Sequence, residues 1–92
     1  MGTDKFTHKK IGNRLRAFRS ILEMSQKDFA LMNNFNATQY TNWETGARRI
    51  PIQSAAQLEE RYGLTLDFIY LGRLRTLPHN LAADLSESPL LN

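Results

Sequence analysis

The chain has 92 residues, 41% of them hydrophobic, which is enough for one small domain but too few for a core that also encloses an active site. It contains no cysteine and two histidines far apart in the sequence, so neither a disulfide framework nor a metal site is expected. Scattered Asp and Glu residues, without a glycine-rich phosphate loop or a partnered histidine, indicate neither an enzyme nor a cofactor. No apolar run approaches the about 20 residues that span a bilayer, and the first residues lack an apolar leader, which predicts a cytoplasmic protein with no membrane partner.

Basic residues are concentrated in the first half of the chain. The formal net charge is +3, with nine Lys and Arg against four Asp and Glu in residues 1–49, and three against five in residues 50–92. A basic half suits a polyanionic partner, although charge on a small protein also serves solubility. Charge alone leaves both interpretations open.

Residues 1–7 show no pattern and predict a flexible N-terminal arm. Thr7 can cap a helix that runs from about His8 to Glu23 and carries an apolar stripe with the helical period. The stripe consists of Ile11, Leu15, Phe18 and Leu22. The basic side chains around it are typical of a solvated helix face.

Residues 25–46 predict two short helices joined by a tight turn. Ser25 can cap the first helix, and Asn33-Asn34 breaks it because Asn accepts the left-handed conformation of a helix-ending turn. Asn36 can cap the second helix, which ends at Gly46 and has an apolar back. That back consists of Tyr40 and Trp43, and the other face carries Thr38, Thr41, Asn42 and Thr45. A helix with small polar side chains on its outer face suits the reading of base edges.

The rest of the chain predicts further short helices. Pro51 suits the start of a helix that runs to about Tyr62, and Thr65 can cap a helix over residues 66–71 that ends at Gly72. Pro78 is tolerable only if it begins a new short helix, and residues 86–92 are expected to be frayed. Leucines with helical spacing in this region either pack on the chain's own core or cover a partner subunit. They are Leu74, Leu77, Leu81 and Leu85.

Five segments, in this order and spacing, resemble the Cro/CI-type (Xre, phage-repressor-like) helix-turn-helix family of DNA-binding domains. They are IGNRLRAFR at residues 11–19, SQKDFA at 25–30, NWETG at 42–46, Pro51, and YGLTLDFIYLG at 62–72. The resemblance implies an all-α, five-helix, lambda-repressor-like domain at residues 8–72. The C-terminal extension, residues 73–92, then becomes a possible dimerisation segment with a frayed end.

The chain departs from the family pattern at two neighbouring residues. Asn34 stands where the family usually has glycine, and Asn can take that role at a modest energetic cost. Asn33 stands where the family usually has an apolar residue. Either Asn33 is hydrogen-bonded at the edge of the core, or the first helix of the pair ends one residue early.

The resemblance also implies roles for individual residues. Base reading falls to Ala37, Thr38, Thr41 and Asn42 on the second helix of the pair. Phosphate contacts fall to Gln26, Arg48, Arg49 and Arg19, and the family's arginine at Arg19 also pairs with the glutamate at Glu44. Apart from the resemblance, Lys9 and Lys10 lie near the start of the first helix, where they could also reach phosphates. The alternative for Arg48 and Arg49 is that they offset the partial negative charge at the end of the helix before them. Support of the reading helix falls to Glu44 through that pair. The residues themselves add Trp43 and Tyr40 as the apolar back of this helix and Asn36 as its cap.

The expected function is therefore a sequence-specific regulator of transcription, a repressor, that binds double-stranded DNA as a homodimer. Its uncharged reading face predicts a preference for A·T pairs. The alternative is an antitoxin or adaptor built on the same fold, which would bind a protein through its C-terminal leucines. The leucines available for either kind of protein contact are Leu71, Leu74, Leu77, Leu81 and Leu85.

Overall fold

The computed structural model describes the backbone of residues 3–91 and the side chains of residues 7–91. Over this range the chain forms six α-helices, two short 3-10 turns and no strand, which confirms the all-α prediction. The elements are α1 (Thr3–Ile21), α2 (Gln26–Met32), α3 (Ala37–Thr45), α4 (Ile52–Tyr62), α5 (Leu66–Leu71), η1 (Leu74–Thr76), α6 (His79–Ser86) and η2 (Pro89–Leu91). The helix expected to begin at Pro78 is α6.

The first helix is longer at its start than the sequence predicted. It begins at Thr3, so the expected arm is helical over residues 3–7, and Thr7 lies inside the helix instead of capping it. No glycine or proline interrupts the chain between Thr3 and the predicted start at His8, which allows the helix to continue. Residues 1 and 2 lie outside the described part of the chain.

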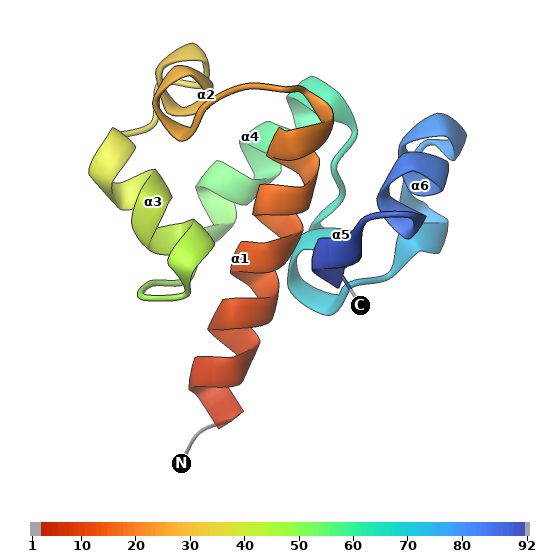
Figure 1. Cartoon of the computed structure of the whole chain (residues 1–92), viewed down its shortest axis with the longest axis horizontal. Coiled ribbons are helices and arrows are strands. Elements are labelled where there is room, and N and C mark those ends of the chain that lie inside the picture. The colour runs from red at the N-terminus through yellow and green to blue at the C-terminus, as the bar shows by residue number, and fades with distance from the viewer. Residues whose placement is uncertain (1–2, 92) are drawn as a thin grey trace.

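Helix α1 runs through the middle of the molecule, with α2 and α3 on one side and α5 and α6 on the other (Figure 1). Three members of its predicted stripe, Ile11, Leu15 and Phe18, are buried. The aromatic ring of Phe18 meets that of Tyr62 at a centroid distance of 5.0 Å and that of Phe29 at 6.1 Å. The single core therefore joins the end of α4 to the helix pair α2–α3.

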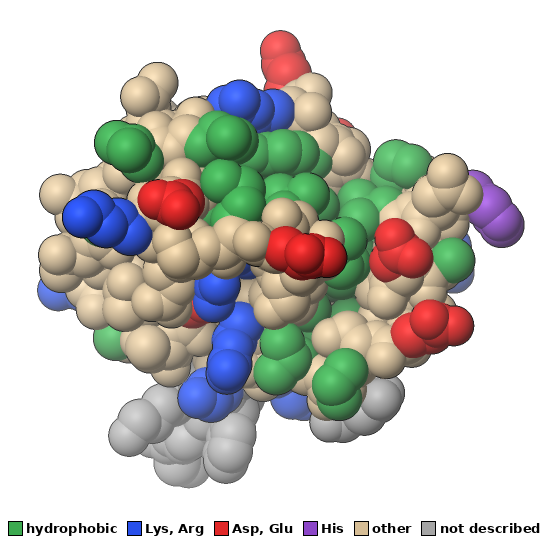
Figure 2. All heavy atoms as spheres, turned by 45° about the horizontal axis from the view of Figure 1, so that its top comes forward, with side chains coloured by type: hydrophobic (Ala, Val, Ile, Leu, Met, Phe, Trp, Pro, Cys, Tyr) green, Lys and Arg blue, Asp and Glu red, His purple; other side chains and the backbone are tan. Residues whose placement is uncertain are grey.

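Apolar side chains also reach the surface. Figure 2 shows them gathered across the face where α1 ends, which this view brings forward. Several residues from this end of the molecule are only partly buried against the core: Ile21, Leu22, Met24 and Tyr62. A domain of this size cannot cover all of its apolar surface, because it has a high ratio of surface to volume.

Both alternatives for Asn33 occur together. Helix α2 ends at Met32, and Asn33 is fully buried as its C-terminal cap. The side-chain nitrogen of Asn33 donates to the carbonyl of Phe29 (2.9 Å) and to the hydroxyl of Tyr62 (3.1 Å). Gln57 donates to the backbone carbonyl of Asn33 at 2.6 Å. These hydrogen bonds tie α2 to α4.

The C-terminal segment packs on the chain's own core. Leu77 and Leu85 are buried, Leu74 and Leu81 are partly buried, and only Leu71 of the five leucines is largely exposed, at 57%. The expected frayed end is wrong for residues 86–91, because η2 contacts α1 and Leu90 and Leu91 pack against the core. Asn92 lies outside the described residues. Leu77 and Leu85 are consequently not available to a partner in the folded chain.

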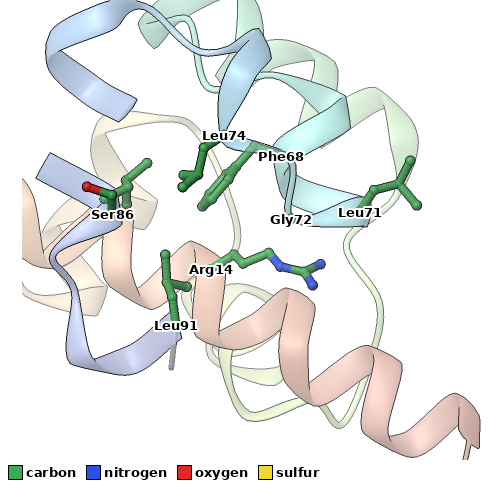
Figure 3. A pocket seen from close by; sticks show the side chains of 8 residues that line it. Arg14, Phe68, Leu71, Gly72, Leu74, Ser86 and Leu91 are labelled. Atoms are coloured by element: carbon green, nitrogen blue, oxygen red, sulfur yellow. The ribbon is translucent and has the colours of Figure 1, made fainter. Parts of the chain in front are cut away.

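Arg14 links α1 to the end of α5. Its Nη1 donates to the carbonyl of Ile69 at 3.0 Å, and burial lowers the pKa of the guanidinium. Figure 3 shows the guanidinium pointing toward Gly72 and Leu71, where α5 ends. A cation at this end of a helix offsets the partial negative charge of the last carbonyls. The side chains drawn there line a hollow of about 230 Å³ between α1, α5 and the C-terminal segment.

None of the helices in the described part of the chain is both long and apolar enough to cross a membrane. Among the same residues, no three His, Asp or Glu side chains are grouped so that they could hold a metal ion.

Candidate nucleic-acid interface

The two helices of the expected helix-turn-helix are capped as their sequence predicted. The side chain of Ser25 accepts a hydrogen bond from the backbone N–H of Asp28 at 3.1 Å, and Asn36 accepts one from that of Gln39 at 3.0 Å. Between them, Asn34 adopts a φ of 60°, the left-handed conformation expected of it in place of glycine. At the other end of α3, Gly46 has a φ of 85°. Both ends of α3 are therefore set by local signals.

Aromatic packing holds the back of α3. Tyr40 and Trp43 are buried, as expected, and their rings lie 5.9 Å apart. The ring of Tyr40 lies 5.2 Å from that of Phe29 on α2, and the ring of Trp43 lies 5.2 Å from that of Phe35 in the turn. The sequence reasoning missed Phe35, although an aromatic residue inside an otherwise polar turn could have indicated a packing role. Together these rings fix the angle between α2 and α3.

The opposite face of α3 is open. Ala37 and Thr38 are exposed, and Thr41 and Asn42 are half-buried. All four expected base readers thus reach the surface of one helix. None of them carries a charge, so this face can offer only hydroxyl, amide and methyl groups to a partner.

Glu44 connects α3 to α1 and α2. Its carboxylate accepts from Arg19 Nε at 2.7 Å and from Arg19 Nη2 at 3.0 Å, so the expected pair is present and bidentate. Gln26 Nε2 donates to the same carboxylate at 2.9 Å, and Arg19 Nη1 donates to the carbonyl of Met24 at 2.8 Å. The side chain of Glu44 is only 2% exposed. This network anchors α3 from its buried side.

The network also determines the ionisation states of Glu44 and Tyr40. Burial alone would raise the pKa of Glu44, but hydrogen bonds from Arg19 and Gln26 and the charge of Arg19 outweigh burial and lower that pKa. Burial and the neighbouring Glu44 carboxylate raise the pKa of Tyr40. At neutral pH the site therefore holds an ionised carboxylate and a neutral phenol.

Two expected phosphate contacts are engaged inside the protein. All three guanidinium nitrogens of Arg19 donate within the network, and its side chain is only 14% exposed, so it positions α3 instead of facing outward. The side chain of Gln26 is held by Glu44 and also accepts from Thr41 Oγ1 at 3.4 Å. Sequence spacing could not reveal the hydrogen bond between Gln26 and Glu44, because the two residues are 18 positions apart.

Gly12 is a further residue that the sequence reasoning missed. A Cβ built on Gly12 would lie 2.3 Å from the backbone oxygen of Glu44 and 2.6 Å from that of Trp43. The end of α3 therefore meets the backbone of α1 directly. A glycine in the middle of a predicted helix was the available signal.

The remaining basic residues divide between two faces. Arg48 and Arg49 are exposed and border a shallow depression that is also lined by Gln39, Asn42, Trp43 and Pro51. Lys9 is exposed, and its backbone lies against Gly46, at the start of the loop between α3 and α4 that carries Arg48 and Arg49. Lys10 instead lines a hollow with Leu90 and Leu91, on the face covered by the C-terminal segment. The structure thus groups Lys9, but not Lys10, with the end of α3.

Comparison of the chain with protein-family models, curated protein sequences and solved structures finds no match. The chemistry of the site is that of a neutral hydrogen-bonding face flanked by exposed cations. Such a surface can make hydrogen bonds to uncharged polar edges while the cations attract anions beside them.

Proposed function

We propose that the protein is a sequence-specific, double-stranded-DNA-binding repressor of the Cro/CI-type helix-turn-helix family, with a lambda-repressor-like arrangement of its helices. The observation that carries the proposal is the combination of a buried back and an open polar face on α3. It is capped at Asn36, buried along Tyr40 and Trp43, and open along four small uncharged residues next to two exposed arginines. An α-helix of this kind fits the major groove of B-form DNA.

Two sets of residues would divide the work. Thr38, Thr41 and Asn42 reach base edges, where Asn can bond N6 and N7 of adenine together and a Thr methyl can touch that of thymine. Arg48 and Arg49, with Lys9 nearby, contact phosphates and set the position of α3 without reading sequence. Arg19 and Glu44 hold α3 at the angle that both sets need.

One short helix reads only a few base pairs, so useful specificity requires two copies on half-sites about 10 base pairs apart. Leu71 is the C-terminal leucine exposed enough to contribute to such a dimer, because Leu77 and Leu85 are in the core. Leu71→Lys should shift the protein toward monomer in sedimentation equilibrium. It should also abolish cooperative binding to paired half-sites while leaving the fold intact.

The decisive experiment is selection of bound duplexes from a random double-stranded DNA library, followed by binding measurements at 50 and 200 mM salt. A regulator should enrich one motif, rich in A·T pairs, and should bind it more tightly than random duplex at both salt concentrations. Enrichment of no motif, with affinity that depends only on salt, would leave a merely basic protein and overturn the proposal.

Two substitutions test the division of roles. Asn42→Ala should relax the preference at one base position, with a loss of discrimination of about 1–3 kcal/mol. Arg49→Ala should weaken binding to all sequences alike and lower the slope of log affinity against log salt by about one unit. If both variants lose affinity equally for every duplex, readers and phosphate contacts have been assigned wrongly.

A further inference from the structure

The orientation of the Gln26 amide is determined by its neighbours. Glu44 is ionised and can only accept hydrogen bonds, so the NH2 group of Gln26 must face it, in agreement with the contact of 2.9 Å. The amide oxygen of Gln26 then faces Thr41. The Arg19–Glu44 pair in turn leaves the carboxylate no freedom to rotate, because both of its oxygens accept from the guanidinium.

This orientation fixes the polarity of the Thr41 hydroxyl. A hydroxyl has one proton to donate and two lone pairs that accept. Thr41 donates its proton to Gln26 Oε1 across 3.4 Å, a long hydrogen bond, and in this arrangement its lone pairs are left for a group that approaches from outside. Thr41 is one of the half-buried residues on the open face of α3, where a partner can reach it.

We infer that Gln26 is a specificity-determining positioning residue, which makes Thr41 select a base whose major-groove edge offers an amino group. This inference rests on the proposed function, because it concerns how the same helix would read DNA. Adenine N6 and cytosine N4 are donors that the Thr41 lone pairs can accept, whereas guanine O6 and thymine O4 are acceptors that require the proton already given to Gln26. Arg19 and Glu44 thereby influence sequence preference without touching a base.

The test uses the full chain and duplexes that carry each of the four bases at every position of the selected site. The unsubstituted protein should favour adenine or cytosine over guanine or thymine at the base facing Thr41. The expected preference is about fivefold to tenfold, the effect of one mismatched neutral hydrogen bond. Gln26→Ala frees the Thr41 proton and should reduce that preference to about twofold or less, with other positions unchanged.

Two substitutions at Thr41 separate hydrogen bonding from packing. Thr41→Val keeps the shape but removes the hydroxyl and should lose the same preference, whereas Thr41→Ser keeps the hydroxyl and should retain it. Gln53→Ala is the matched control, because Gln53 is an exposed glutamine on α4 outside the network. It should leave every base preference as it was.

A measurement on the free protein tests the network independently of DNA. In an amide NMR spectrum, one side-chain N–H of Gln26 should be shifted downfield and protected from solvent exchange relative to those of Gln53. If the two side chains behave alike, or if Gln26→Ala leaves all base preferences unchanged on a selected site, the inference is overturned and the proposed function stands. Failure to select any site would overturn the proposed function, and the base-reading role of Thr41 with it.

Discussion

Glu44 is a carboxylate that is almost completely buried at the meeting point of α1, α2 and α3. A buried ion pair is costly to break, because removal of one partner leaves the other charge without compensation. Glu44→Gln should therefore lower the free energy of unfolding at pH 7 by about 3 kcal/mol, the lower end of the usual range, since Arg19 keeps partial access to water. Urea unfolding monitored by the fluorescence of Trp43 measures this change.

The same pair predicts a dependence of stability on pH. The pKa of Glu44 in the folded protein lies below its ordinary value of 4.5, so below that pH the unfolded chain binds more protons than the folded chain. The stabilisation is complete above about pH 4.5 and is lost as the pH falls through the lowered pKa. The difference in stability between the unsubstituted protein and Glu44→Gln should shrink accordingly. Gln53→Ala, on the exposed surface of α4, removes no carboxylate and should show no such convergence.

Gly12 makes the close approach of α1 and α3 possible. An added Cβ would lie 2.3 Å from a backbone oxygen of α3, which cannot move without the helix. Gly12→Ala should destabilise the protein by roughly 1–3 kcal/mol, although alanine favours helix formation more than glycine does. Arg16→Ala, at an exposed position on α1, is the control and should change stability by about 0.5 kcal/mol or less. A stabilised Gly12→Ala variant in thermal unfolding would show that the two backbones do not meet.

At the scale of elements, α3 depends on the cap at its start. Asn36 Oδ1 satisfies one backbone N–H that has no partner inside the helix. Asn36→Ala should lower the free energy of unfolding by about 0.5–2 kcal/mol, whereas Asn36→Ser keeps a capping oxygen and should lie within a few tenths of the unsubstituted protein. Equal losses in both variants, measured by urea unfolding, would mean that Asn36 acts by a contact other than the cap.

Helices α2 and α3 show which structural features can be predicted from neighbouring residues in the sequence. The caps at Ser25, Asn36 and Thr65 were predicted from sequence, because each acts on a backbone group three residues away. The left-handed residue at Asn34 followed from the same local reasoning. The burial and hydrogen bonds of Asn33 could not be predicted in this way, because its partners Gln57 and Tyr62 come from α4. The sequence raised two alternatives there, and both of them occur.

At the scale of the whole molecule, the C-terminal segment belongs to the core. The radius of gyration is 12.1 Å, in line with the about 12 Å expected of a compact chain of this length. Leu85 is fully buried and should cost about 2–5 kcal/mol of stability when replaced by alanine. Leu71→Ala is the matched control on a largely exposed leucine and should cost less than about 1 kcal/mol.

One core also implies one unfolding transition. Trp43 fluorescence, which reports on α3, and circular dichroism, which reports on all helices, should give coincident urea curves. A Leu85→Ala variant as stable as Leu71→Ala, or separate transitions for the two probes, would show that residues 73–91 do not share the core.

The sequence by itself determined the all-α class, the ends of most helices and the aromatic back of α3, because these depend on periodicity and on capping groups within four residues. Tertiary structure decided which leucines turned inward, which groups Gln26 and Arg19 bonded, and what the face of α1 that carries Lys10 meets. Each of those outcomes depends on groups brought together from distant parts of the chain, such as Gln26 and Glu44 or Arg14 and Ile69. Spacing along a helix reports which side chains share a face, but only packing decides what that face meets.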